Sequence, residues 1–356
     1  MNWLDSAIQH CVTKTTLNSR KFKDFPHITE GGKYQFTLDG VWTGGFWTGL
    51  LWLCYEEQRD PELLTAAKGF TERLLPRAND SRNHDLGFMF YPSAIAGWRL
   101  TGEESYHAAA LNAAESLARQ FNEAGGFIPG WGFFGGEEWA GAVLIDTLMN
   151  LPLLVWASDN DGGDRLLRVV DTHTAKALDN HLRADGSVFH VYHFSPQGEP
   201  LQGDTYQGLA PGSAWSRGQG WAIAGLSMLA GARGNKRYRE AAQQVAQFIM
   251  ANLPADRIPL WDYRDGAASA PKDASAGAIS AFGLLRLFKI TQKAEYLSCA
   301  EEMLKALSER CLSDENEGLL SHATADLPHG LGIDESTIYG DYYFLKALLE
   351  LKKTAD

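Results

Sequence analysis

The chain has 356 residues, of which 45% are hydrophobic and 21% are charged, and its formal net charge is −12. This composition is typical of a globular protein with a large core, and it excludes a disordered, collagen-like or coiled-coil chain. The acidic balance argues against a protein that binds nucleic acid through a basic surface. A length prior of about 150 residues per domain suggests two domains, although single domains of this size occur.

No run approaches the roughly 20 uninterrupted apolar residues of a membrane helix. The nearest, residues 140–157, contains Asp146, Asn150 and Pro152. The first residues show no basic region followed by an apolar block, so no signal peptide is predicted. The cysteines match no zinc or redox spacing, which favours reduced, mostly buried thiols at Cys11, Cys54, Cys299 and Cys311. We therefore expect a cytoplasmic protein.

Two kinds of helical segment alternate along the chain. Six segments have few charges and many aromatic and small residues, which is typical of helices buried on all sides. They begin near Trp42, Asp85, Glu137, Ser213, Asp273 and Ser336. The segments between them carry apolar residues at helical spacing with charges interspersed, which predicts amphipathic helices. These cover residues 2–16, 60–77, 103–121, 164–183, 235–253 and 293–311.

Six buried helices that alternate with six amphipathic ones predict an all-α (α/α)6 barrel, with the whole chain, residues 1–356, in one domain. The alternative is an open solenoid, whose terminal repeats need a polar outer face. The last helix, residues 339–351, is as apolar as the interior ones, so closure is favoured. Residues 186–194 and 199–207 alternate in polarity around a Pro-Gln-Gly turn and predict a small β-hairpin at the barrel rim.

The inner helices of such a barrel run in one direction, so their first turns gather at one end. These turns carry Trp42, Asp85, Glu137, Glu138, Trp215, Arg217, Trp221 and Asp273. Aromatic rings stack on sugar rings and polar groups fix their orientation, so the set predicts a carbohydrate site. Helix N-termini also favour an anionic ligand.

Two aspartates and one arginine in these segments each have a structural and a functional interpretation. Asp146 is expected about nine residues, or roughly 13 Å, into its helix. A carboxylate buried there must be paired, protonated or functional. Asp85 begins its segment in His84-Asp85-Leu86-Gly87, where an aspartate is ordinarily a helix cap. Arg217 either pairs with a carboxylate across the barrel or binds a substrate carboxylate in a bidentate manner.

Two other patterns point away from cofactors. Residues 130–135 fit the dinucleotide motif G-x-G-x-x-G, but no strand precedes them, so they more simply present Trp131 over the site. His190 and His193 are three apart on a predicted strand and point to opposite faces, so they should not chelate one metal ion. One of the two is expected to face the pocket.

Several segments, in order along the chain, together resemble the unsaturated glucuronyl hydrolases of glycoside hydrolase family 88. They are residues 42–47 (WTGGFW), 84–88 (HDLGF), 145–153 (IDTLMNLPL), 215–221 (WSRGQGW), 273–276 (DASA) and 340–343 (GDYY), with Gln207-Gly208 and residues 51–53 (LWL). The resemblance implies an (α/α)6 barrel with two key aspartates, which fall on Asp85 and Asp146. It places substrate contacts at Trp42, Trp131, His190, Gln207, Arg217 and Trp221. The family's Ser/Lys cluster for sulfated substrates is incomplete here, because residues 330–341 contain Ser336 but no lysine.

The resemblance also implies a reaction, with no cofactor and no metal. The substrate is an oligosaccharide from a polysaccharide lyase that ends in a 4,5-unsaturated uronic acid. Asp146 is expected to act as general acid and base, protonating C4 while water adds at C5, and Asp85 to bind ring hydroxyls. The hemiketal opens to release a keto acid and a shorter saccharide.

Three alternatives stay open. An unsaturated rhamnogalacturonyl hydrolase would use the same chemistry on pectin fragments. A sugar 2-epimerase would need histidines deep on the inner helices. A saccharide-binding protein would have little use for a buried Asp146.

Overall fold

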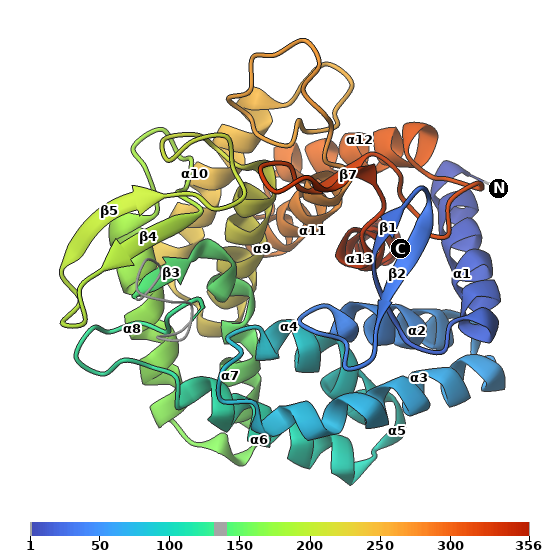
Figure 1. Cartoon of the computed structure of the whole chain (residues 1–356), viewed down its shortest axis with the longest axis horizontal. Helices are drawn as coiled ribbons and strands as arrows, with labels where there is room; N and C mark the ends of the chain where they lie inside the picture. Colours follow the sequence, from blue (N-terminus) through green and yellow to red (C-terminus); the bar gives the residue numbers. More distant parts are fainter. Residues whose placement is uncertain (1, 132–140, 356) are drawn as a thin grey trace.

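The computed structural model describes residues 2–131 and 141–355, whose helices form two concentric layers (Figure 1). The inner layer contains α2 (Gly44–Gln58), α4 (Leu86–Phe90) with its continuation α5 (Ala96–Thr101), α7 (Leu151–Ala157), α9 (Ser216–Arg233), α11 (Ala274–Thr291) and α13 (Ile338–Ala355). The outer layer contains α1 (Trp3–Lys21), α3 (Pro61–Leu74), α6 (Glu104–Ala118), α8 (Arg165–Asn180), α10 (Lys236–Asn252) and α12 (Ala294–Arg310). The predicted (α/α)6 arrangement is therefore present in the described residues.

The ring closes between its first and last helices. α13 packs against α2, and α1 contacts α2, α12 and α13, which brings both chain ends to one side of the ring (Figure 1). One apolar core runs from Leu4 to Leu351. Among the described helices, only α11 is long and apolar enough to cross a membrane, and it is mostly buried within the barrel. The cysteines are buried and unpaired, as predicted.

The difference between the layers follows from the sequence. In α9, every residue from Ser216 to Ser227 is buried. In α8, the buried residues recur at helical spacing, as Leu166, Val169, Val170 and His173, which is the pattern of a helix with one face on the core. A helix with one apolar face, such as α8, therefore lies in the outer layer, whereas a helix that is buried on all sides, such as α9, lies in the inner layer.

The third inner segment differs from the prediction. Residues 142–144 form a short strand, β3 (Ala142–Leu144), and a 3₁₀ turn, η5 (Ile145–Met149), follows before α7 begins at Leu151. The expectation that Asp146 lies nine residues into a helix is therefore wrong. Pro152 occupies the first turn of α7, the position where a helix tolerates proline, so the helix starts after Asp146. Glu137 and Glu138 lie outside the described residues.

Three small antiparallel sheets decorate the barrel. The predicted hairpin is confirmed as β4 (Val191–Phe194) and β5 (Pro200–Asp204), and β3 adds a third strand beside β4. Two further hairpins were missed: β1 (Phe25–Glu30) with β2 (Lys33–Thr37), and β6 (Ala323–Asp326) with β7 (Leu331–Glu335). Gly31 and Gly32 both have positive φ at the first turn, and such a Gly-Gly pair is a hairpin signal in the sequence.

A close backbone contact holds α4 against the segment that carries Asp146. A Cβ atom on Gly87 would lie 2.3 Å from the Asn150 Cα atom. The Phe88 N–H donates to Asn150 Oδ1 at 2.7 Å in the same contact. Since Asp85 and Asp146 flank these residues, the packing of α4 on this turn fixes how the two carboxyl groups lie relative to each other.

This contact predicts opposite outcomes for two glycine substitutions. Gly87→Ala forces a methyl group into backbone atoms and should lower the free energy of unfolding by about 1–3 kcal/mol. Gly69→Ala is the control, because Gly69 is exposed on α3 with no atom within 4 Å of its Cβ position. There the helix should gain about 0.5–1 kcal/mol. Urea unfolding measures both, and a Gly87→Ala protein as stable as the parent would contradict the argument.

Candidate active site

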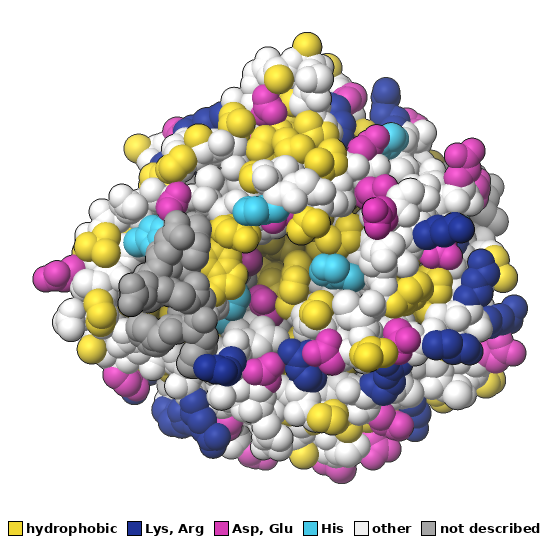
Figure 2. Space-filling view, viewed as in Figure 1, with side chains coloured by type: hydrophobic (Ala, Val, Ile, Leu, Met, Phe, Trp, Pro, Cys, Tyr) yellow, Lys and Arg dark blue, Asp and Glu magenta, His cyan; other side chains and the backbone are white. Residues whose placement is uncertain are grey.

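A cavity of about 510 Å³ opens at the end of the barrel where the inner helices begin. Figure 2 shows the hollow, with hydrophobic side chains on its walls and acidic side chains within it. Seven of the eight predicted site residues line it: Trp42, Asp85, Trp131, Asp146, Gln207, Arg217 and Trp221. The eighth, His190, does not. Residues that are far apart in the sequence therefore meet in one concave site, as expected of a ligand pocket.

Asp85 is not a helix cap. It precedes α4, but its side chain accepts no capping hydrogen bond from the helix. Instead, Asn150 Nδ2 donates to Asp85 Oδ1 at 3.3 Å, and the side chain is about one-seventh exposed, at 14%. A cap accepts from backbone N–H groups of the first turn, so the ordinary structural explanation for this aspartate fails.

Asp146 lies on η5, where its surroundings stabilise its charge only weakly. Its Oδ1 atom is buried without a hydrogen bond among the described residues. Arg217 acts on it only at longer range, as a charge that favours the ionised form. The structural interpretation, an aspartate held ionised by an arginine or by several backbone donors, does not match this environment.

Both carboxyl groups are held toward their neutral forms. Burial raises the pKa of Asp85 to about 7. For Asp146, burial comes first and the neighbouring Asp85 charge second, and they raise the pKa to about 6. Desolvation disfavours a carboxylate, and a second carboxylate nearby adds to the effect. Such a pair binds a proton near neutral pH, which suits general acid catalysis.

Arg217 lines the cavity but is tied to the protein. Its Nη1 donates to Asp273 Oδ2 at 2.9 Å and to the Thr324 carbonyl at 2.7 Å, and its Nη2 donates to the Ala325 carbonyl. Three of the five guanidinium N–H groups are therefore used. Only the remaining N–H groups can bind a substrate carboxylate, so the predicted bidentate contact is limited to them. The alternative prediction, an ion pair across the barrel, is present as Arg217–Asp273.

The predicted tryptophans form two surfaces of the cavity. Trp42 stacks on Tyr339, with ring centroids 5.3 Å apart, and Trp221 is almost fully buried against Phe88. Trp131 lies on the other side, 5.1 Å from the Tyr206 ring. These rings supply the apolar faces on which a sugar ring can stack.

His190 supports the cavity wall from behind. Its Nδ1 lies 3.2 Å from the Tyr206 N–H and 3.3 Å from the Gln207 N–H, and its ring packs on Trp215 at 4.2 Å. The predicted direct contact between His190 and substrate stays a prediction. His193 is not among the described cavity residues either, and its Nε2 lies 3.0 Å from Asp204 Oδ2. The expectation that one of the two histidines faces the pocket therefore does not hold for the cavity as described.

Among the cavity residues that were not predicted to contact the substrate are Tyr206, Asp326, Trp215 and His84. His84 directly precedes Asp85, and Trp215 lies two residues before Arg217, so their position next to predicted site residues could have identified them. Tyr206 follows β5, and Asp326 ends β6, in a hairpin that was missed. No pattern in the sequence marks either of them.

Comparisons with known proteins agree with this fold. The model of Glycosyl Hydrolase Family 88 matches residues 15–353. The unsaturated glucuronyl hydrolase of Bacillus sp. (strain GL1) is 36% identical over 363 residues, covering 98% of this chain and 96% of that protein. The unsaturated chondroitin disaccharide hydrolase of Streptococcus agalactiae serotype III (strain NEM316) is 33% identical over 368 residues, covering 98% and 92%. The crystal structure of unsaturated glucuronyl hydrolase from Bacillus sp. GL1 has a TM-score of 0.93 at 34% identity, covering 99% of this chain and 97% of that one.

The buried ion pair predicts that Arg217 is needed for folding as well as for binding. Both side chains of the Arg217–Asp273 pair are almost fully buried, at 2% and 0% exposure. Arg217→Ala leaves Asp273 without its cation and should lower the free energy of unfolding by about 3–5 kcal/mol. Arg168→Ala is the control, since its pair with Glu123 is exposed and such pairs contribute little. Denaturant unfolding measures the stability of both variants. An Arg217→Ala protein whose unfolding midpoint equals that of the parent would refute the prediction.

Proposed function

Because the chain belongs to glycosyl hydrolase family 88, we propose that it hydrolyses oligosaccharides whose non-reducing end is a 4,5-unsaturated uronic acid. The observation that carries this proposal is a pair of largely buried carboxyl groups, Asp85 and Asp146, which face one aromatic cavity. Asp85 does not cap its helix, and Asp146 Oδ1 has no hydrogen-bond partner among the described residues. The relatives named above are glucuronyl and chondroitin disaccharide hydrolases. The protein is thus a glycoside hydrolase.

The proposed chemistry is a hydration. The C4=C5 bond of the unsaturated sugar is a vinyl ether, so protonation at C4 places positive charge on C5, beside the ring oxygen. Asp146 supplies that proton, and its carboxylate then takes a proton from the water that adds at C5. The product at C5 is a hemiketal, which opens and releases the shortened saccharide and a keto acid. The environment of Asp146 supports this role, because its buried Oδ1 has no competing partner.

Asp85 and the cavity walls have binding roles in this proposal. Asp85 accepts hydrogen bonds from ring hydroxyls of the uronate. Trp42 stacks on its apolar face, the almost fully buried Trp221 supports this wall of the cavity, and Trp131 lies next to Tyr206. Gln207 is held at the wall by its Nε2 bond to the Ala325 carbonyl, 3.0 Å away. Arg217 adds positive charge near the substrate carboxylate.

The alternatives are less well supported. A pectin-directed rhamnogalacturonyl hydrolase has the same chemistry, but the relatives reported above act on glucuronyl or chondroitin substrates by name. A sugar 2-epimerase would need histidines on the inner helices, but the described helices α2, α4, α5, α7, α9, α11 and α13 contain none.

We further propose that the chain works as a single catalytic domain. The cytoplasmic location stays a prediction.

The hydration mechanism predicts a strict requirement for the double bond. An unsaturated uronyl disaccharide should lose its ultraviolet absorbance when the enzyme is added, because the conjugated C4=C5 bond is consumed. The saturated glucuronide with the same linkage should be inert over the same time. A panel of lyase products from chondroitin, hyaluronan, heparin, gellan and pectin extends the assay to the preferred linkage. Rapid cleavage of the saturated glycoside would rule out the mechanism.

The environment of Asp146 predicts how its removal changes stability with pH. Its folded pKa of about 6 lies above the value near 3.9 of an unfolded aspartate. The folded state therefore binds more protons between these values, so the stability contributed by this site falls as pH rises through the window and stays low above it. Asp146→Asn should abolish turnover, retain binding, and gain stability relative to the parent from about pH 4 to pH 6, by up to roughly 3 kcal/mol.

Asp262→Asn is the matched control. The Asp262 carboxylate accepts from Ser213 Oγ at 2.6 Å and from the Ala214 and Arg264 N–H groups. An amide cannot accept all of these bonds, so this variant should lose stability at neutral pH. Melting curves across pH compare the two. A destabilised Asp146→Asn would show that the carboxylate holds the fold together.

A further inference from the structure

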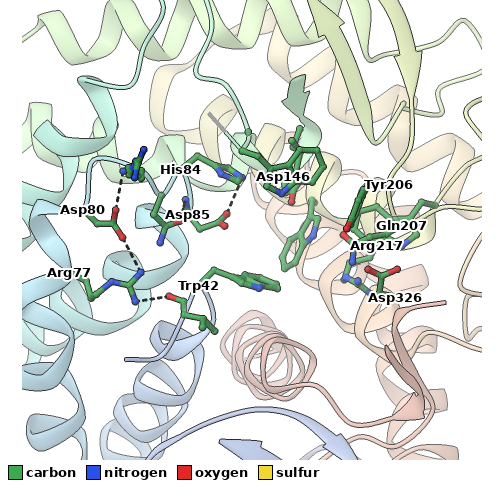
Figure 3. A pocket seen from close by; sticks show the side chains of 18 of the residues that line it. Trp42, Arg77, Asp80, His84, Asp85, Asp146, Tyr206, Gln207, Arg217 and Asp326 are labelled. Atoms are coloured by element: carbon green, nitrogen blue, oxygen red, sulfur yellow. Dashed lines mark hydrogen bonds and ion pairs between the residues drawn. The ribbon is translucent and has the colours of Figure 1, made fainter. Parts of the chain in front are cut away.

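One arginine at the mouth of the cavity joins two segments on which the proposed reaction depends. Arg77 lies in η1 (Leu75–Asn79), the 3₁₀ turn that follows α3. Its side chain is 20% exposed, and it lines the cavity together with Trp42 and Asp85. The proposed reaction assigns it no role. Figure 3 shows Arg77 between Asp80 on one side and the segment that carries Trp42 on the other.

On one side, Arg77 holds the backbone just before Trp42. Its Nη1 donates to Asp39 Oδ2 at 3.0 Å, and it lies 3.1 Å from the Asp39 carbonyl oxygen and 3.2 Å from that of Val41. Asp39 Oδ1 in turn accepts from the Val41 N–H at 3.1 Å. Both backbone polar groups of Val41 are therefore bound to Arg77 or to its ion-pair partner.

Val41 needs this support because its backbone is strained. Its φ is 41°, a positive value that a β-branched residue rarely adopts. Residues in such conformations persist only where the surrounding structure holds them there. The next residue is Trp42, whose ring stacks on Tyr339 and lies 5.8 Å from the ring of Phe88. The bonds from Arg77 therefore help to fix the direction in which the chain enters Trp42.

On the other side, Arg77 holds the segment that leads to Asp85. Its Nη2 donates to Asp80 Oδ2 at 3.0 Å, and Asp80 Oδ1 accepts from the Arg82 N–H at 3.0 Å. Farther along, Asn83 Oδ1 accepts from the Asp85 N–H at 2.9 Å. Side chains of the segment thus hold its own backbone in place up to Asp85, and its first residue is bound to Arg77.

We propose that Arg77 is a positioning residue, which fixes the distance between the ring of Trp42 and the carboxyl group of Asp85. It does so by bridging Asp39 and Asp80 through the two terminal nitrogens of one guanidinium group. This inference rests on the function proposed above, in which Trp42 stacks on the uronate and Asp85 binds its hydroxyls. Two groups that hold one sugar must keep a definite separation, and a displacement of about 1 Å can lower a rate a hundredfold or so.

The first test compares Arg77→Met, which removes the bridge, with Arg77→Lys, which keeps the charge. Calorimetry measures Kd for an unsaturated uronyl disaccharide in the Asp146→Asn background, and kcat and KM are measured in the parent background. We expect Kd and KM of Arg77→Met to rise about tenfold, with kcat within about threefold of the parent. The reason is that Arg77 binds the segments of Trp42 and Asp85 and not η5, which carries Asp146. Arg77→Lys should recover little, because an ammonium group lacks the planar fork.

Arg233→Met is the matched control. Arg233 lies in the last turn of α9, at the end of that helix away from the cavity, and it pairs with Asp171. Its side chain is 28% exposed, close to the value for Arg77. Removing this pair should lower the melting temperature by a similar amount and leave Kd, KM and kcat unchanged. A loss confined to kcat in Arg77→Met, or an unchanged Kd, would overturn the proposal.

The second test asks whether Arg77 acts through Trp42. A double-mutant cycle compares Kd for the parent, Arg77→Met, Trp42→Ala and the double variant. Once the ring is gone there is no separation left to fix, so Arg77→Met should then raise Kd by less than about threefold. A merely structural arginine would cost the same factor in both backgrounds, and that result would refute the proposal. If Arg77→Met does not fold, Asp80→Ala removes one end of the bridge and takes its place.

A third measurement needs no substrate. In protein labelled with fluorotryptophan, the ¹⁹F NMR signal of Trp42 is identified by its absence from Trp42→Phe protein. Because Trp42 lies against Tyr339 and Phe88, its signal depends on the position of its ring. Arg77→Met should move this signal and leave that of Trp156, on α7, in place, and an unmoved Trp42 signal would contradict the proposal. If the signal moves in a protein that consumes no unsaturated uronide, the proposed function fails and the positioning of Trp42 by Arg77 stands.

Discussion

The buried ion pair between Arg217 and Asp273 joins three parts of the structure at the cavity. Arg217 lies in the first turn of α9, and Asp273 caps α11 by accepting from the Ser275 and Ala276 N–H groups. The same guanidinium reaches the carbonyls of Thr324 and Ala325 on β6. Two inner helices and a hairpin are therefore held together by one cation. These contacts add to the packing of α9 on α11 and of α11 on β6 in holding the three parts in register around the cavity.

The aspartates of this protein show how a structural carboxylate differs from a functional one. Asp273 and Asp262 are buried and accept hydrogen bonds from side chains and backbone N–H groups. Asp85 and Asp146 have few such partners, although they are largely buried. Asp273 and Asp262 are thus satisfied by the protein, whereas Asp85 and Asp146 keep carboxyl oxygens available for a ligand. Burying carboxyl groups with few partners lowers the stability of the fold, and it does so at the site where the chemistry takes place.

The position of these two acids depends on backbone packing as much as on their own side chains. Asp85 precedes α4, and Asp146 lies on a turn that α4 approaches at Gly87 without room for a methyl group. Asn150 connects the two segments, since it accepts from the Phe88 N–H and donates to Asp85. Site geometry and barrel packing are therefore coupled, so a substitution that shifts α4 should also change the positions of the two carboxyl groups.

Much of the fold could be read from the sequence because helical periodicity is local. Whether a segment is apolar all round or on one face, as in α9 and α8, depends on residues within a few turns of one another. The alternation of the two kinds of helix then implied a closed barrel, and closure implied that Trp42, Asp85, Arg217 and Trp221 meet. The prediction of the third inner helix was wrong in its first half, where β3 and η5 stand. An apolar run cannot be assigned to a strand or to a buried helix from its sequence alone, and only the pairing with β4 identifies β3 as a strand.

The partner of each buried polar group was beyond the sequence, because partners come from segments far apart along the chain. Asp85 resembled a helix cap, and only the structure shows that it caps nothing. Arg217 was equally compatible with a substrate and with Asp273, 56 residues away. His190 was itself a predicted site residue and His84 only stood next to one, yet the first lies behind the wall and the second lines the cavity. The amino-acid sequence by itself determined most of the predicted residues that gather at the mouth of the barrel. Tertiary packing decided which of their polar atoms are satisfied and which are left for a substrate, because hydrogen-bond geometry depends on distances that local patterns do not encode.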